Sequence, residues 1–329
     1  MLMAWRERIG YDDGSRTPSD GIRWFWTLTF TTDRRIFMNE SNRRQMLTGA
    51  AAMAAAATVP SLVRADSFQP PMQLTKLRGN IRHAFARWCY GGISLDDLCQ
   101  FCVRLGVPGI DLLGPDDFPT LKKYDLTCPM VSAPASIGRG WNRIEHHDEL
   151  VAIFEKLIPQ VAEAGFPNVI CMSGNRAGLD DDTGVENCVT GLKRILPLAE
   201  KHGVNLVMEL LNSKRDHGDY QCDHTTWGVR VCKGTGSSRM KLLYDIYHMQ
   251  VMEGDVIATL RENIDYIAHI HTGGCPGRNE IDETQELYYP AIMRALLDLK
   301  FEGYVAQEFL PRGKDPLASL ERCIRICDI

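Results

Sequence analysis

The sequence has no long run of basic residues and no large excess of charge of either sign. Its 329 residues carry a formal net charge of −5, with a pI near 6.0. Proteins that bind nucleic acid through its phosphates usually display a basic stripe on their surface. We therefore exclude nucleic acid as the partner.

Paired CxxC motifs, which hold structural zinc ions, are also missing. The 11 cysteines are scattered, and the single CxxC motif, Cys99 to Cys102, lies inside a helical pattern. We interpret the cysteines as buried thiols and not as a disulfide or metal framework.

The alanine-rich segment 38–65 is too short and too weakly apolar for stable insertion into a membrane. It contains the pair Arg43 and Arg44, and it ends in Val-Arg-Ala at Ala65, which fits a cleavage site. This pattern resembles a twin-arginine export signal and predicts a periplasmic protein. The alternative is an ordinary alanine-rich helix, and the protein would be cytoplasmic if the signal is not used.

The segments around this signal are not expected to belong to the folded domain. Residues 1–37 lack clear periodicity and precede a plausible initiator, Met38, so we expect them to come from an over-long gene start. Residues 66–78 would form a linker. The single folded domain is expected to cover 79–329.

From residue 79 onward, short apolar runs alternate with amphipathic helical patterns. The runs that we interpret as strands cover 80–87, 108–114, 126–133, 168–174, 205–212, 241–247, 266–273 and 304–310. The helical patterns cover 94–106, 147–165, 188–203, 254–264, 289–300 and 316–329, with a weak one near 116–124. Eight predicted strands that alternate with helices predict an α/β fold, a (β/α)8 TIM barrel.

An open doubly wound sheet is the main alternative to the barrel. Such a sheet more often carries a glycine-rich phosphate-binding turn after its first strand. The corresponding stretch here, "ARWCYGGIS", has no GxGxxG motif. The barrel is therefore favoured.

Four consecutive predicted strands end in side chains that can bind a metal ion: Glu209, Asp245, His271 and Glu308. The carboxyl ends of barrel strands meet at one face, so these groups are expected to converge. Three carboxylates around an imidazole would repel one another without a cation, so we predict one divalent ion. Oxygen-rich ligands with one nitrogen favour Mn²⁺, Mg²⁺ or Co²⁺, with Zn²⁺ as an alternative.

His269 is the alternative imidazole ligand, because it precedes His271 by two residues and faces the same side of the strand. We favour His271, which lies closer to the loop. Taken singly, an acid such as Glu209 at a strand end is usually solvated or paired with a basic residue. The metal interpretation depends on the four groups together.

The segments "MELLN", "DIYHMQ", "HIHTGGCPGRNE", "ELYYP" and "QEF" resemble the hydroxypyruvate isomerase family. That family belongs to the wider xylose isomerase-like barrels, which include sugar isomerases and epimerases. The resemblance covers residues 79 to 315 and is densest from 205 to 310. It implies an isomerase that acts on a small sugar or keto acid, and it is compatible with a homo-oligomer.

The resemblance also implies roles for individual residues. The ion would be held by Glu209, Asp245, the residue at 271 and Glu308, and the two glutamates would form the acid/base pair. His248 and Arg278 would contact the substrate, although a capping histidine and a solvated loop arginine are the alternatives. These roles follow from the resemblance and not from the spacing of the residues in the sequence.

Position 271 departs from the pattern of the hydroxypyruvate isomerases. Those enzymes usually have glutamine there, whereas ketose 3-epimerases of the same superfamily have histidine. The departure leaves the substrate open.

Two glutamates beside a metal ion can move a proton through an enediolate. Return of the proton to the adjacent carbon gives isomerisation, return to the opposite face gives epimerisation, and loss of a leaving group gives a lyase. An exported lyase or hydrolase of 3-keto-glycosides is therefore one alternative, and a non-catalytic periplasmic sugar-binding barrel is another. Apurinic endonucleases share this barrel but hold three zinc ions with many more histidines than the 9 present here.

Two further stretches are candidates for substrate contact. On the first predicted strand, His83 and Trp88 are expected near the pocket, although Trp88 could equally belong to the core. The long polar loop after the third predicted strand contains Trp141, Asn142 and His147, which we expect to form a lid.

Overall fold

The structure is a computed structural model that describes residues 76–329. The expected upstream segment 1–37, the expected export signal 38–65 and most of the expected linker 66–78 lie outside the described residues. Among the helices that are described, none is long and apolar enough to cross a bilayer.

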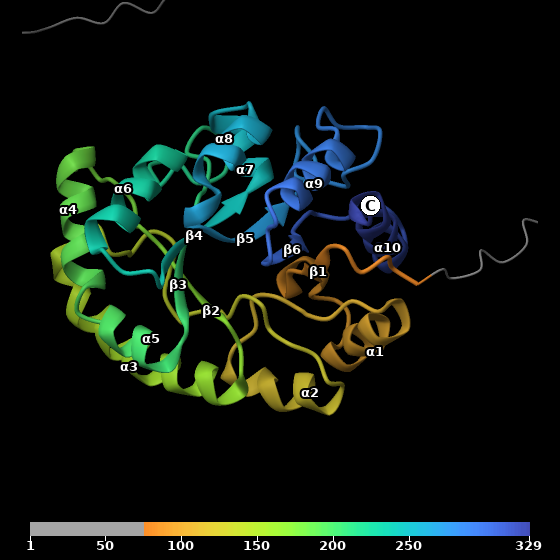
Figure 1. The fold of residues 1–329 in the computed structure, drawn as a ribbon, viewed down its shortest axis with the longest axis horizontal. Coiled ribbons are helices and arrows are strands. Elements are labelled where there is room, and N and C mark those ends of the chain that lie inside the picture. Colours follow the sequence, from red (N-terminus) through yellow and green to blue (C-terminus); the bar gives the residue numbers. More distant parts are fainter. Residues whose placement is uncertain (1–75) are drawn as a thin grey trace, which may run out of the picture. The chain divides into compact units, whose positions relative to one another are not determined.

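Six parallel strands form the regular part of a curled sheet, in the order β1-β6-β5-β4-β3-β2. Their bounds are β1 (Arg82–Phe85), β2 (Asn168–Cys171), β3 (Asn205–Glu209), β4 (Met240–Asp245), β5 (Ile267–Thr272) and β6 (Tyr304–Gln307). Five of them lie within a predicted strand, and β4 begins one residue before the predicted strand 241–247. Figure 1 shows the strands inside a ring of helices, which is the arrangement of a TIM barrel.

Two of the eight predicted strands, 108–114 and 126–133, are irregular. They are connected by the isolated parallel bridges Ala86–Asp111, Gly109–Thr127, Leu113–Val131 and Val131–Val169, which link β1 to β2 and close the sheet. Leu112 interrupts the extended backbone with a φ of +60°. Gly109 is required where these segments meet, because a Cβ there would lie 2.7 Å from Cδ of Pro129. These two segments therefore occupy strand positions of the barrel without forming regular strands.

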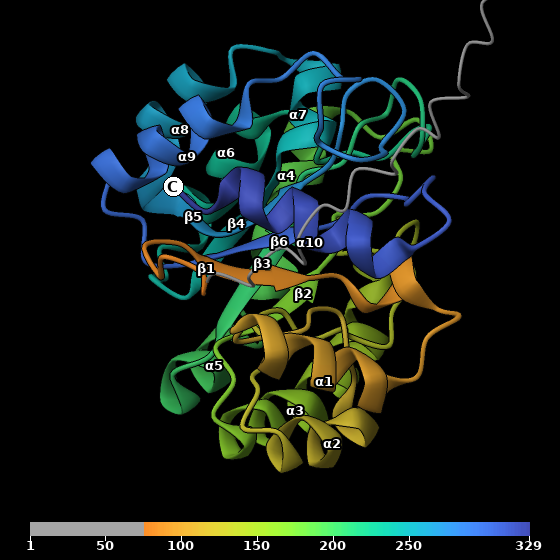
Figure 2. The ribbon, with the colours of Figure 1, turned by 90° about the vertical axis from the view of Figure 1, so that its right-hand side faces the viewer.

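The described helices surround the strands. The α-helices are α1 (Leu95–Leu105), α2 (Phe118–Lys123), α3 (His147–Ala164), α4 (Asp181–Leu192), α5 (Leu196–His202), α6 (Thr225–Thr235), α7 (Ile246–Met252), α8 (Val256–Asn263), α9 (Tyr289–Asp298) and α10 (Pro316–Cys327). Short 3₁₀ turns are η1 (Arg87–Tyr90), η2 (Pro115–Asp117), η3 (Ile144–His146) and η4 (Ile264–Tyr266). In Figure 2, α1, α2, α3 and α5 lie on one side of the strands, with α8 and α9 on the other.

The helix signals in the sequence are confirmed at α1, where Ser94 accepts the N–H of Asp97 and Gly106 ends the helix in the left-handed conformation. The predicted single helix 188–203 is wrong. The chain forms α4 and α5 instead, and α5 begins at a proline-containing turn. Proline is favoured in the first turn of a helix and disfavoured further inside it, which explains the break.

The predicted strand 241–247 is too long by two residues. β4 ends at Asp245, whose side chain accepts the N–H of His248 at 3.1 Å and so starts α7. A carboxylate at the N-cap satisfies one of the free N–H groups of the first helical turn. Asp245 therefore lies at the junction of strand and helix, at the carboxyl end of the barrel.

Most of the core lies between the strands and the surrounding helices. A second, smaller cluster contains Met130, Ile170, Val207 and Leu243. Val207 lies two residues before Glu209 and therefore faces the same side of β3. The small cluster thus fills the interior of the barrel below the ends of the strands.

Candidate active site

Four adjacent strands each bring one ionisable side chain to the same point. Glu209 ends β3, Asp245 ends β4, His271 is the penultimate residue of β5, and Glu308 directly follows β6. All four are buried, and one ligand atom of each lies within 4.8 Å of the others. The structure therefore brings together the four residues that the sequence predicts as metal ligands.

Direct contacts connect the members of this group. Nδ1 of His271 lies 3.0 Å from Oε2 of Glu308 and 3.4 Å from Oε1 of Glu209. Arg278 donates from Nη2 to Oε2 of Glu308 at 2.6 Å, and the same nitrogen lies 3.7 Å from Oδ2 of Asp245. Glu308 is thus held by several donors, whereas the one ion-pair partner of Glu209 among the described residues is the imidazole of His271.

Burial and charge shift the ionisation of these groups in opposite directions. Burial raises the pKa of Asp245 to about 8 and also raises the pKa of Glu209. Burial opposes the ionisation of Glu308 too, but the charges of His271 and Arg278 outweigh it and hold the pKa of Glu308 well below its usual range. The charge of Glu308 in turn overcomes the burial of His271 and raises the pKa of that imidazole.

The residues fit a divalent cation. Oε1 of Glu209 and Oδ2 of Asp245 are buried, and neither accepts a hydrogen bond from the described residues. A buried polar atom without a partner is costly, and a carboxylate oxygen that faces other carboxylates is more so. Three carboxylates and one imidazole are the donor set that manganese, cobalt and magnesium accept, so one ion at this point would satisfy the unpaired oxygens.

His248 is oriented by a neighbour that the sequence did not single out, Asn212. Oδ1 of Asn212 accepts the N–H groups of Arg215 and Asp216, which leaves its Nδ2 as the donor to Nδ1 of His248 at 2.6 Å. Burial lowers the pKa of His248 well below its usual value, so the ring is neutral and carries its proton on Nε2. Nε2 lies 3.7 Å from Oδ2 of Asp245 and has no other partner among the described residues. His248 can therefore donate a hydrogen bond at the site.

Arg278 is part of the same group and is not a solvated loop arginine. Its side chain is 14% exposed, and its guanidinium lies 5.3 Å from the ring centre of Trp88 and 5.7 Å from that of Tyr247. Trp88, in η1, also donates from Nε1 to Oε1 of Glu308 at 2.7 Å. Trp88 is 45% exposed, so it lies at the rim of the site and not in the core.

The structure does not bring His83 to the site. His83 pairs in register with Val305, whose neighbours in β6 face the interior, so His83 faces the outer side of the sheet. Its Nε2 lies 3.7 Å from Asp328, beyond α10. The predicted contact between His83 and substrate therefore loses its geometric basis.

The loop after the third predicted strand does not form a lid. Trp141, Asn142 and His147 are all buried. His147 bonds through Nε2 to the carbonyl of Trp141, and Asn142 donates to Oε1 of Gln221. These side chains pack the scaffold because the loop bends back over the end of β2.

A second buried group lies beside the first. Asp111 bonds through Oδ2 to Nε2 of His269 at 2.5 Å, and the same oxygen lies 3.3 Å from Nε2 of His271. His269, the alternative ligand, is therefore bonded to Asp111, whereas His271 faces the four-residue group. The signal for Asp111 was an acid in the otherwise apolar run "GIDLL".

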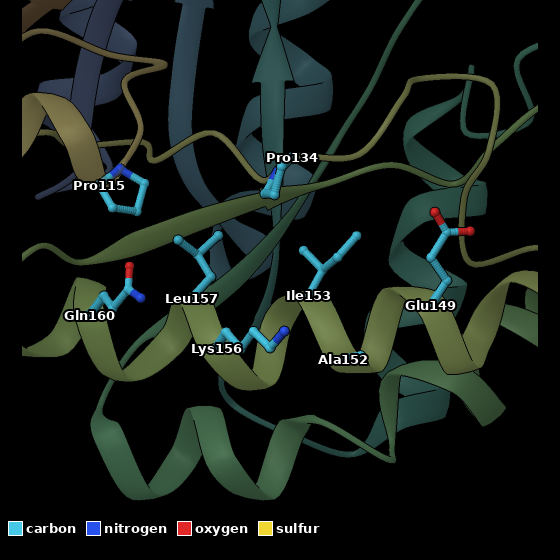
Figure 3. Close-up of a pocket in the computed structure, with 8 residues that line it drawn as sticks. All are labelled: Pro115, Pro134, Glu149, Ala152, Ile153, Lys156, Leu157 and Gln160. Carbon is cyan, nitrogen blue, oxygen red and sulfur yellow. The ribbon is translucent and has the colours of Figure 1, made fainter.

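An apolar groove of about 460 Å³ runs along α3, lined by Pro115, Pro134, Ile153 and Leu157 among others (Figure 3). Its lining also includes Glu149 and Lys156. It shares no residue with the buried ionisable groups, so we place the chemistry at the strand ends and not in this groove.

The model of the xylose isomerase-like TIM barrel family matches residues 119–326, more than half of the chain. The chain belongs to this family. The barrel and the wider superfamily expected from the sequence are therefore confirmed.

Curated relatives of this xylose isomerase-like chain include isomerases. The 2-oxo-tetronate isomerase of Cupriavidus necator is 35% identical over 115 residues, which cover 35% of this chain and 44% of the relative. The hydroxypyruvate isomerase of Escherichia coli is 26% identical over 149 residues, which cover 45% of this chain and 57% of the relative. The chain spans about half the length of the curated relatives that it matches.

Similar solved structures include a family 2 AP endonuclease from Brucella melitensis, with a TM-score of 0.65 at 21% identity over 73% of this chain and 96% of that one. The 3-keto-D-glucoside 4-epimerase of Escherichia coli has a TM-score of 0.62 at 17% identity, and the match covers 74% of this chain and 98% of that one. D-psicose 3-epimerase from Clostridium cellulolyticum has a TM-score of 0.58 at 18% identity, and the match covers 74% of this chain and 90% of that one. At these identities the likeness shows the fold alone.

Proposed function

We propose that this protein is a divalent-metal-dependent isomerase or epimerase of a small keto acid or ketose. The proposal rests on one observation, the convergence of Glu209, Asp245, His271 and Glu308 at the ends of four adjacent strands. The names of the curated relatives, hydroxypyruvate isomerase and 2-oxo-tetronate isomerase, support a small keto acid as the substrate class.

The four residues would hold one divalent ion, which would polarise a substrate carbonyl and make the neighbouring C–H group more acidic. Glu209 and Glu308 come from the two outer strands of the row β3-β4-β5-β6, so they would hold the ion from opposite ends of this row. Glu209 has an oxygen without a donor and is suited to remove the proton. Glu308 would act at the second proton-transfer position.

Three neighbours would hold the substrate. His248 presents Nε2–H beside Asp245, and Arg278 presents a guanidinium fixed between two aromatic rings. A planar guanidinium can bind a carboxylate or two hydroxyl oxygens with two hydrogen bonds. Trp88 would cover the outer side of the site and keep Glu308 in place through its indole N–H.

A solvent-exchange experiment tests the proposal. The full chain, loaded with Mn²⁺, would be incubated in D₂O with hydroxypyruvate, 2-oxo-tetronate, D-fructose, D-psicose and a 3-keto-glucoside, and the Mn²⁺ would be removed from the reaction mixture before the products are examined by NMR. We expect deuterium at an α-carbon of one of the first four, with isomer or epimer as product. Release of an aglycone from the glucoside would instead indicate a lyase or hydrolase.

Two substitutions give this experiment its specificity. Glu209→Gln and Glu308→Gln should each abolish exchange. Glu253→Gln is a matched control, because Glu253 accepts hydrogen bonds from Thr225 outside the site, and it should exchange normally. Binding of a sugar without exchange by the unaltered protein would contradict catalysis and favour a binding barrel.

We further propose that the protein is exported, on the evidence of Arg43, Arg44 and the alanine-rich segment that follows them. Cell fractionation should find a mature chain that begins near Asp66 in the periplasm. Replacement of both arginines with lysine should retain the protein in the cytoplasm, and a full-length cytoplasmic protein in unaltered cells would contradict export.

A further inference from the structure

Three fully buried ionisable side chains, Asp111, His269 and His271, form the second group next to the metal ligands. Only His271 belongs to both groups. Its two ring nitrogens face different partners, since Nδ1 lies 3.0 Å from Glu308 and Nε2 lies 3.3 Å from Asp111. The imidazole thus bridges the two groups.

The position of Asp111 is fixed by its backbone and its second oxygen. Its N–H donates to the carbonyl of Phe85, its carbonyl accepts the N–H of Arg87, and its Oδ1 accepts the N–H of Met130 at 3.2 Å. Only Oδ2 is left for the imidazoles of His269 and His271. A buried carboxylate in this setting has a defined orientation toward both rings.

We propose that Asp111 is a positioning residue for the metal ligand His271, which rests on the proposed metal-dependent function. An ionised carboxylate only accepts hydrogen bonds, so the nitrogen that faces Asp111 must carry the proton. With its proton on Nε2, a neutral His271 has its lone pair on Nδ1, directed at Glu209 and Glu308. Asp111 thereby selects both the tautomer and the ring orientation that metal binding needs.

His269 completes the arrangement. It bonds the same oxygen through Nε2 at 2.5 Å, and its Nδ1 has no hydrogen-bond partner among the described residues. His269 therefore provides Asp111 with a second donor, which helps offset the cost of burying its charge. A second cation held by Asp111, His269 and His271 is the competing explanation, and it is an outcome of the test below.

Asp111→Asn is the informative substitution, because asparagine keeps the shape and can retain the bond to Met130 through Oδ1. Its Nδ2 would then present a donor where Asp111 presents an acceptor. His271 would have to accept this hydrogen bond on Nε2 and carry its proton on Nδ1. A protonated Nδ1 has no free lone pair and could not bind the ion. The matched control is Asp223→Asn, since Asp223 is also buried but pairs with Arg176.

The measurement is a calorimetric titration of the metal-free full chain with Mn²⁺, which gives the affinity and the number of ions per chain. Loss of a carboxylate that orients a histidine ligand typically weakens metal affinity about 10- to 100-fold, and we expect this for Asp111→Asn. Asp223→Asn should bind Mn²⁺ as the unaltered chain does, with one ion per chain. Equal affinity in Asp111→Asn, or two ions per chain of which one is lost on His269→Phe, would overturn the proposal.

A second measurement is made on the unaltered chain, so its result does not depend on the folding of a variant. In the unaltered chain loaded with Mg²⁺ or Zn²⁺, ¹⁵N NMR of labelled histidines should show His271 protonated on Nε2, and assignment can use His271→Gln. Protonation on Nδ1 would overturn the inference even if the enzyme is active. Absence of any metal binding by the unaltered chain would overturn the proposed function as well, whereas normal binding with the wrong tautomer overturns only the role of Asp111.

Discussion

Replacing Asp245 with asparagine should weaken the binding of a divalent ion and, in the metal-free chain, raise the free energy of unfolding. Asp245 is fully buried, its Oδ1 accepts the N–H of His248, and its Oδ2 accepts no hydrogen bond from residues 76–329. Asparagine can keep the contact to His248 and removes the charge. The metal-free variant should therefore be more stable than the metal-free unaltered chain, although its affinity for a divalent ion falls.

The pKa of Asp245 sets the size and the pH range of this effect. Burial raises the pKa from 3.8 to about 8, so between these values the folded chain binds a proton that the unfolded chain has released. The stability of the metal-free chain therefore falls as pH rises through this window. At about 1.4 kcal/mol per pH unit, the cost is roughly 4 kcal/mol at pH 7, as an upper bound because relaxation reduces burial costs.

The assay is urea unfolding of the EDTA-treated chain at pH 5 and at pH 7. The stability advantage of Asp245→Asn should grow by up to about 3 kcal/mol between these two values. Asp223→Asn is the control, because hydrogen bonds to Arg176 and other donors outweigh burial and lower the pKa of Asp223, so its loss should destabilise the chain at both values. Equal destabilisation by Asp245→Asn at pH 5 and pH 7 would refute the reasoning.

Three further substitutions test separate parts of the molecule. Trp88→Phe removes the hydrogen bond to Glu308 but keeps a ring, so kcat should fall about tenfold or more, as expected for a bond to a charged group, and an unchanged kcat would contradict its role. Gly140→Ala would place a Cβ against the backbone carbon of Ser173, so urea unfolding should show that the free energy of unfolding falls by about 3 kcal/mol or more. Glu280 is buried, but hydrogen bonds from two backbone N–H groups and a serine hydroxyl outweigh burial and lower its pKa. Glu280→Gln should therefore be less stable at neutral pH, and this difference should shrink below about pH 4 as the unaltered glutamate is protonated, which acid unfolding would reveal.

The fold could be predicted where apolar periodicity and helix caps agree. Ser94 and Gly106 mark the ends of α1, and β3 lies within the predicted strand 205–212. The segments 108–114 and 126–133 were predicted as strands, but their irregular pairing could not be predicted, because the positive φ at Leu112 leaves no local sequence signal. The end of β4 was misplaced because Asp245 has two roles, strand end and helix cap, and the apolar pattern continues into α7.

The ligand group was predictable because a barrel brings the ends of its strands together, so one acid or imidazole per strand implies a cluster. Residues that orient the site through hydrogen bonds could not be predicted from the sequence. Asn212 orients His248 and Asp111 faces His271, yet neither belongs to a spacing pattern, and each became recognisable only through its contacts. His83 shows the reverse error, since a one-residue step along a strand reverses the face to which a side chain points.

The central claim is that the four residues at the ends of β3, β4, β5 and β6 hold one divalent ion. Its most direct test is an anomalous difference map from crystals of the full chain grown with Mn²⁺. We predict a single strong peak in contact with one atom each of Glu209, Asp245, His271 and Glu308. A map without a peak at this point, or with the four side chains directed away from a manganese ion bound elsewhere, would contradict it.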